Sequence, residues 1–91
     1  MKMKIVVRFS KAAGRRYLRP IPDLKDDSLY NKQVRVTAFS PGGERYVFIG
    51  RVGKYPGKPQ YGYVIYVSRR RFPVLDKFVG EGWEAEVEVI Q

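Results

Sequence analysis

The feature that most constrains the fold of this chain is strict alternation between apolar and polar residues. Residues 83–89 show it best, since apolar side chains at the odd positions are separated by glutamates at the even ones. Residues 3–9 and 34–39 show the same period, with basic residues at several intervening positions. A period of two is typical of antiparallel strands with one buried and one solvated face. These three segments therefore predict a mainly β protein.

Further strands and turns extend this prediction. Residues 46–52 and 61–67 are rich in β-branched and aromatic residues, which favour strands. Residues 40–43 (SPGG) have the composition of a turn, and residues 12–14 (AAG) that of a hairpin tip. Because a small open sheet leaves vulnerable edges, we expect five to six or more strands to curl into a small β-barrel, a single domain over residues 1–91.

Helix is expected in only one or two short pieces. Residues 73–79 make the better case, because Pro73 suits the first helical position and Gly80 would close the helix. Residues 23–30 have the composition of a turn or two of helix, and we interpret their three aspartates as acids at its start. Tyr63 and Trp83 lie among apolar neighbours and are assigned to the core.

The charge of the chain is strongly basic and unevenly placed. It carries 18 Lys and Arg against 9 Asp and Glu, a net charge of +9. Every basic residue precedes position 80, whereas Glu81, Glu84, Glu86 and Glu88 lie beyond it. Such a field attracts polyanions, of which nucleic acid is the most abundant; an acidic protein or an anionic membrane surface are the alternatives. Abundant Arg, Lys and Val beside few Asn and Gln are typical of thermophilic proteins.

The absence of two residue types limits the reactions and metal sites that the chain can support. The chain has no Cys and no His, which excludes disulfides, thiolate zinc sites and every Ser-His or Cys-His catalytic arrangement. We predict no metal, no cofactor and no enzymatic activity. No apolar run approaches the roughly 18 residues of a membrane span, so we expect a cytoplasmic protein with no membrane partner.

The predicted contacts to nucleic acid fall in three basic clusters. The first surrounds the Gly14 tip, and alternation places Arg15, Tyr17 and Arg19 on one side of its strand. The second precedes the Pro73 helix. The third interleaves lysine and tyrosine in the loop or hairpin arm at residues 53–62, which suits base stacking or a groove-probing arm. The residues predicted to contact nucleic acid are Lys11, Arg15, Arg16, Arg19, Lys54, Lys58, Arg69, Arg70 and Arg71.

Each cluster has a structural alternative. The first could be a solvated strand face with Tyr17 packed at the rim. The second, residues 69–71, could form ion pairs with Asp76 or with Glu84, Glu86 or Glu88 of the acidic strand at residues 83–89. The third could be an ordinary long loop. Phosphate contact is favoured for the two arginine clusters, because several convergent guanidinium groups bind phosphate strongly.

Residues 6–39 and 48–90 share an order of parts: strand, tip, strand, short helix, strand. In this alignment Leu18 falls opposite Val64, and Ile21 falls opposite Val67. We interpret the two stretches as an internal repeat, which predicts a pseudo-two-fold axis with Ile21 and Val67 at related core positions. The alternative is that any two such units would align equally well.

Each half resembles the swapped-hairpin unit of AbrB/MazE-type transcription factors. The first half supplies Ser10, residues 14–15 (GR) and residues 21–22 (IP); the second supplies residues 66–70 (YVSRR) and 80–82 (GEG) before the acidic strand. In that family, units from two chains interleave into one barrel that grips DNA. The resemblance implies a single-chain pseudo-dimer or a homodimer of such chains.

These observations together predict a nucleic-acid-binding protein that contacts phosphates through Arg and Lys. Double-stranded DNA is favoured over RNA, with a role as a transcriptional regulator or a chromatin-like architectural protein. One alternative is an RNA or single-strand binding barrel of the oligonucleotide-binding type. The other is a small basic ribonuclease of the toxin kind, for which the sequence marks no proton donor.

Overall fold

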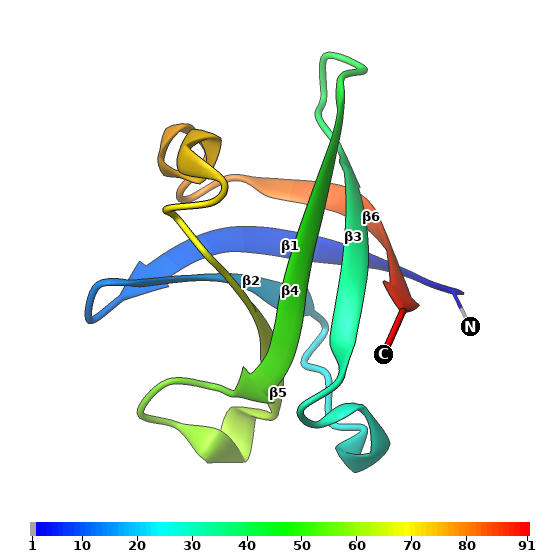
Figure 1. Ribbon diagram of the computed structural model, residues 1–91, viewed down its shortest axis with the longest axis vertical. Coiled ribbons are helices and arrows are strands. Elements are labelled where there is room, and N and C mark those ends of the chain that lie inside the picture. The colour runs from blue at the N-terminus through cyan, green and yellow to red at the C-terminus, as the bar shows by residue number, and fades with distance from the viewer. Residues whose placement is uncertain (1) are drawn as a thin grey trace.

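The chain folds into a closed barrel of six antiparallel strands (Figure 1), which a computed structural model describes over residues 2–91. Around the barrel the strands follow the order β1-β2-β5-β4-β3-β6, with β6 pairing back to β1. The prediction of a small β-barrel is confirmed. The strands are β1 (Lys2–Ala12), β2 (Arg15–Ile21), β3 (Gln33–Phe39), β4 (Arg45–Lys54), β5 (Tyr63–Val67) and β6 (Gly82–Val89).

The alternating segments place their apolar residues inside the barrel. On β1 the inward positions include Val7 and Phe9, and on β6 they include Trp83, which is 4% exposed as predicted for a core residue. Tyr63 is only half-buried and packs against the edge of the core. The fully enclosed centre is filled by Val7, Phe9, Leu18, Val34, Val36, Ala38, Phe48, Val52, Ile65, Val67, Trp83, Ala85 and Val87.

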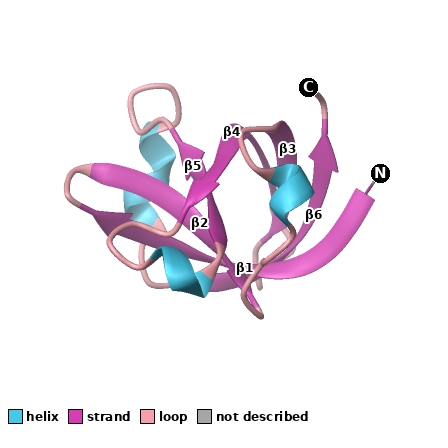
Figure 2. Ribbon diagram, turned by 90° about the horizontal axis from the view of Figure 1, so that it is seen from below, coloured by secondary structure: helices cyan, strands magenta, loops and turns pink. Residues whose placement is uncertain are grey.

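Three short 3-10 helices lie in the connections around the strands (Figure 2), where one or two helices were predicted. They are η1 (Asp27–Leu29), η2 (Pro59–Tyr61) and η3 (Pro73–Lys77). Pro73 opens η3 and Gly80 follows it with a φ of 97°, as the sequence predicted. The η3 helix closes one end of the barrel with the buried side chain of Leu75.

The tip between β1 and β2 is a two-residue turn. Ala12 pairs with Arg15, so only Ala13 and Gly14 lie between the strands, with φ values of 52° and 78°. Positive φ at both positions is the geometry that matches the right-handed twist of a hairpin. The predicted tip is therefore confirmed, and it projects Arg15 at the start of β2.

Strand pairing is unchanged when the two halves of the chain are exchanged. Replacing β1, β2 and β3 by β4, β5 and β6 converts the β1–β2 pair into β4–β5 and the β1–β6 pair into β4–β3, both of which exist. The β2–β5 and β3–β6 pairs map onto themselves. Each half thus has the predicted order of strand, tip, strand, short helix, strand, and the second half has the additional helix η2 in its tip. A common origin of the halves stays a prediction.

The predicted equivalence of Ile21 and Val67 is wrong. Ile21 is 45% exposed, whereas Val67 is 5% exposed and belongs to the core. Shifting the alignment by one residue, so that Leu18 matches Ile65, places buried Pro20 opposite Val67 instead. The original alignment failed because a one-residue slip on a strand exchanges its inner and outer faces.

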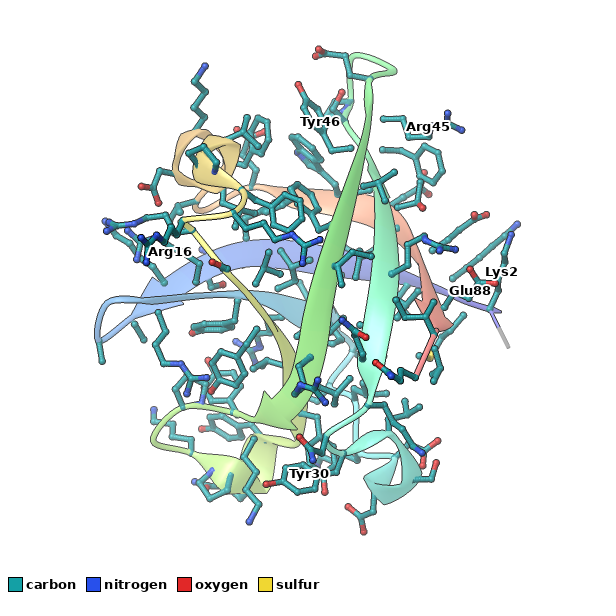
Figure 3. The ribbon with its side chains drawn as sticks, viewed as in Figure 1. Lys2, Arg16, Tyr30, Arg45, Tyr46 and Glu88 are labelled. Atoms are coloured by element: carbon teal, nitrogen blue, oxygen red, sulfur yellow. The ribbon has the colours of Figure 1, made fainter. Side chains whose placement is uncertain are left out.

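Two of the glutamates of β6, Glu86 and Glu88, have cations beside them on the neighbouring strands. Arg35 of β3 donates to Glu88 at 2.8 Å, and Lys2 of β1 is paired in register with the same glutamate (Figure 3). Lys4 lies opposite Glu86 one step along. Glu86 and Glu88 are therefore compensated by nearby cations, and within the described residues β6 forms no ion pair with the arginines of β2 or of residues 69–71. Among residues 2–91, no helix is both long enough and apolar enough to cross a membrane.

Candidate nucleic-acid interface

The outer side of β2 carries the stripe of Arg15, Tyr17 and Arg19 that alternation predicted. Tyr17 lies in register with Ser10 on β1 and with Tyr66 on β5. Tyr66 in turn lies opposite Arg51 of β4, which extends the row across the sheet. Because these residues come from four strands, the row is fixed by the barrel and not by a flexible loop.

The segment after β4 folds over this stripe. The ring of Tyr55 lies 6.0 Å from that of Tyr17, and the guanidinium of Arg19 lies over Tyr55 at 5.1 Å. Tyr55 also contacts Tyr61, which carries the ammonium group of Lys58 at 5.5 Å from its centroid. Two clusters that are distant in sequence, the β1–β2 hairpin and residues 53–62, thus form one surface.

Arg15 stacks on Tyr66 in the middle of this surface. The guanidinium carbon lies 3.6 Å from the ring centroid, and the ring hydroxyl donates to the backbone oxygen of Lys54 at 2.7 Å. Beneath the ring is Gly53, where an added Cβ would lie 2.8 Å from Cε2 of Tyr66. Glycine at this position is therefore required for the ring to lie close to the β4 backbone.

Three hollows open on this surface, with volumes of about 260, 310 and 340 Å³. A fourth, of about 200 Å³, lies at its edge beside residues 59–63 and is lined by Asp27 as well as by Lys25 and Lys54. The first two meet at Arg15 and Tyr66, which line both, and the third is lined by Tyr17 and Tyr55. No carboxylate lines any of the three, all of whose lining residues lie within residues 2–91. Their cations are Arg8, Lys11, Arg15, Arg16, Arg19, Arg51, Lys54 and Arg69.

We call this surface the basic face: the outer side of β2 and β5, the end of β4 and residues 53–62. A larger hollow, about 490 Å³, lies elsewhere, over β1 and β6. It is lined by apolar side chains with Lys4, Glu84 and Glu86, so its charge is mixed. Of these two regions, the basic face has the charge and the aromatic content that the sequence associated with nucleic acid.

Arg16 is a correction to the predicted contacts. Its side chain is 9% exposed, and its Nε donates to Oδ1 of Asp76 at 2.5 Å. This bond lowers the pKa of Asp76 below its ordinary value of 3.8. Arg16 shares the inward side of β2 with Leu18, so it holds η3 against the barrel and is not free to bind phosphate (Figure 3).

Arg69, Arg70 and Arg71 are all exposed, on the segment between β5 and η3. Within the described chain, none of them forms an ion pair with Asp76 or with a glutamate of β6. Arg71 lies 5.5 Å from the centroid of the Phe72 ring. Their guanidinium groups remain accessible, next to the hollow that Arg69 lines.

Arg19 is a weaker candidate than the sequence indicated. Its Nη2 donates to Oδ1 of Asp23 at 3.2 Å, and both side chains are about one-third exposed, at 34% and 32%.

Three residues that line the hollows were not predicted from the sequence: Arg8, Tyr30 and Arg51. Arg51 shares the outward side of β4 with Val47, and its Nη1 donates to the backbone oxygen of Asn31 at 2.8 Å. The strand predicted over residues 46–52 has apolar Phe48 and Val52 on the side opposite Arg51, which was the signal that Arg51 faces outward.

Two tyrosines of the basic face, Tyr17 and Tyr66, have raised pKa values. Burial is the main cause that raises the pKa of Tyr17, and the neighbouring Tyr55 raises it further. Burial also raises the pKa of Tyr66, against the opposing charge of Arg15. Since both phenols stay protonated, neither subtracts from the positive charge of the face.

The aspartates at residues 23–27 have structural partners. Asp26 caps η1 by accepting the backbone N–H of Ser28 at 3.0 Å, as expected for an acid at a helix start. Asp27 accepts the hydroxyl of Tyr63 at 2.6 Å, and Asp23 pairs with Arg19. Over residues 2–91, no group of three acidic side chains is arranged to hold a metal ion.

Comparison with known proteins adds no relative: no family model, no curated protein and no solved structure matches this chain. The predicted resemblance to the AbrB/MazE family stays a prediction. The candidate site therefore depends on the charge, exposure and contacts of the residues themselves.

Proposed function

We propose that the protein binds nucleic acid through the basic face. The observation that carries the proposal is the set of three hollows on one side of the barrel, lined by cations and tyrosines and by no carboxylate. A polyanion over these three hollows meets no carboxylate in their lining, and Asp27 lines only a smaller hollow at the edge of the face. The exposed cations available for phosphates are Arg8, Lys11, Arg15, Arg51, Lys54, Lys58, Arg69, Arg70 and Arg71.

The arrangement favours contacts to the phosphate backbone. The β1–β2 tip, the segment after β5 and residues 53–62 lie on the same side of the barrel, opposite the two chain ends (Figure 1). Cations on three separate projections can follow an extended anion over several phosphates, which fixes its position without reading its sequence. Such contacts are compatible with the chromatin-like architectural role that the sequence predicted, and a single strand can make them equally well.

Binding is favoured over cleavage. General acid–base cleavage of RNA needs a group that accepts a proton near neutral pH. The chain has no His, the three hollows of the basic face have no carboxylate, and the pKa values of Tyr17 and Tyr66 are raised. Asp27, at the edge of the face, accepts the hydroxyl of Tyr63. The basic face therefore has cations to hold a strand but no evident base to attack it.

The dependence of affinity on salt tests the proposal. About six neutralised phosphates should give a slope of log K against log salt near −5, from about −0.9 per contact on duplex DNA. The titration is run with a duplex and with a single strand of equal length. Changing Arg45 to Ala, an exposed arginine outside the basic face, should leave the slope unchanged. A slope shallower than about −2 would show that this face is not the binding surface.

A further inference from the structure

We infer that the ligand of the basic face is a single strand, with one of its bases stacked on the guanidinium of Arg15. This inference rests on the proposed function and specifies which form of nucleic acid the face accepts. It is carried by a column of groups on the outside of the barrel: the Gly53 backbone, the Tyr66 ring above it, and the Arg15 guanidinium above the ring.

The lower part of the column is rigid. Tyr66 is half-buried, its hydroxyl is bonded to the Lys54 backbone oxygen at 2.7 Å, and the Tyr17 ring flanks it at 6.0 Å. The Gly53 backbone prevents the ring from sinking further. A guanidinium 3.6 Å from the centroid of a fixed ring loses much of its rotational freedom, so its plane is already oriented before a ligand arrives.

The upper part of the column is open. Arg15 is exposed, and within residues 2–91 it forms no ion pair and no side-chain hydrogen bond. Its guanidinium lies between two of the hollows. Arg69 lines one of them, and Arg51 and Lys54 line the other. A base on Arg15 would therefore have cations on both sides, where the phosphates that flank it along the strand would lie.

A single strand fits this column and a duplex does not. Bases in a duplex are stacked on one another, so their faces are covered, whereas unpaired bases can stack on aromatic rings or on arginine planes. The exposed ring of Tyr30, which lines the hollow with Arg51 and Lys54, offers a second stacking surface next to the column. Stacking is tolerant of sequence because every base has a π face.

The test is the variant Arg15→Lys, which keeps the charge and removes the planar group. Its affinity is measured for a labelled oligothymidylate of about 16 nucleotides, for a duplex of equal length, and for a strand of the same length with abasic sites in place of bases. We expect the variant to bind the oligothymidylate about tenfold more weakly, with an unchanged salt slope. Affinity for the abasic strand should be equal in the variant and the wild type, since no base is present to stack.

Controls separate this inference from the proposed function. The variant Arg45→Lys, at the far upper end of the barrel in Figure 3, should bind all three probes as the wild type does. If the wild type binds none of the probes, the proposed function fails and the inference with it. If the wild type binds but prefers the duplex, or if Arg15→Lys weakens binding to the abasic strand as much as to the oligothymidylate, the inference alone is overturned.

Discussion

The Nε atom of Arg16 donates a hydrogen bond to Oδ1 of Asp76 across 60 positions of sequence, and so joins β2 to η3. Arg16 is 9% exposed, whereas Asp76 is 46% exposed. A buried guanidinium that lost this partner would leave a charge unpaired at the edge of the core, which is costly. The pair therefore fixes η3, and with it the direction in which the segment at residues 69–71 projects.

Changing Asp76 to Asn should lower the melting temperature by a few degrees at neutral pH. The folded-state pKa of Asp76 lies below its ordinary value of 3.8, chiefly because of the bond from Arg16. The stabilisation is therefore fully present above that value and is lost as the pH falls through the lower folded-state pKa. Thermal unfolding of the variant and the wild type should differ at pH 7 and converge in strong acid.

The matched control is Glu84→Gln, on a carboxylate whose neighbours in register are Val6 and Phe39. It should change the melting temperature little at any pH, since an exposed surface charge contributes little to stability. An undiminished difference between Asp76→Asn and the wild type in strong acid would contradict the assigned pair.

Changing Gly53 to Ala should destabilise the fold and disturb the basic face. The added Cβ would lie 2.8 and 2.9 Å from two carbons of the Tyr66 ring, so the ring must move and carry Arg15 with it. Overpacking of this kind costs about 1–3 kcal/mol. Chemical denaturation measures the loss, and Gly42→Ala is the control, because the nearest atom to its Cβ is the Ser40 hydroxyl at 3.9 Å. Equal stabilities of the two variants would argue against the close approach.

Changing Arg69, Arg70 and Arg71 together to Ala should weaken nucleic-acid binding and leave the fold intact. Each lost phosphate contact reduces the salt slope by about 1, so the triple variant should show a slope shallower by about 3. The melting temperature should barely move, because these side chains are exposed and form no ion pair within the described chain. Filter binding and thermal melting, measured on the same sample, show whether the three arginines bind nucleic acid or stabilise the fold. A large fall in melting temperature with unchanged affinity would remove the three arginines from the site.

The strands could be predicted because alternation records which side of a strand meets water. Residues 83–89 alternate in sequence and in burial, and they form β6 as expected. The closure of the sheet into a barrel could be predicted from its small size, but the order of the strands around the barrel could not. That order places β5 between β2 and β4, and it depends on pairings between distant segments that no local pattern specifies.

The site could be predicted in part, and Arg16 shows why. Most strands have one wet side, but residues 16–18 of β2 are all buried, since the barrel covers one side and Tyr55 covers the other. Proximity in sequence grouped Arg16 with Arg15, whereas the strand period groups it with Leu18. The partner that neutralises it, Asp76, lies in the other half of the chain and could not be found by reading the cluster alone.

The position of β6 has a consequence for synthesis of the chain. β6 supplies the hydrogen bonds along one side of β1 and one side of β3, so both strands keep an unpaired edge until residues 82–89 have left the ribosome. Synthesis of the residues that separate β3 from β6 takes a few seconds at about 5–20 residues per second. Lys2, Lys4 and Arg35 lie on the outward side of these two strands. Like charges there oppose edge-to-edge pairing between neighbouring nascent chains on a polysome, at the stage when they are most exposed to it.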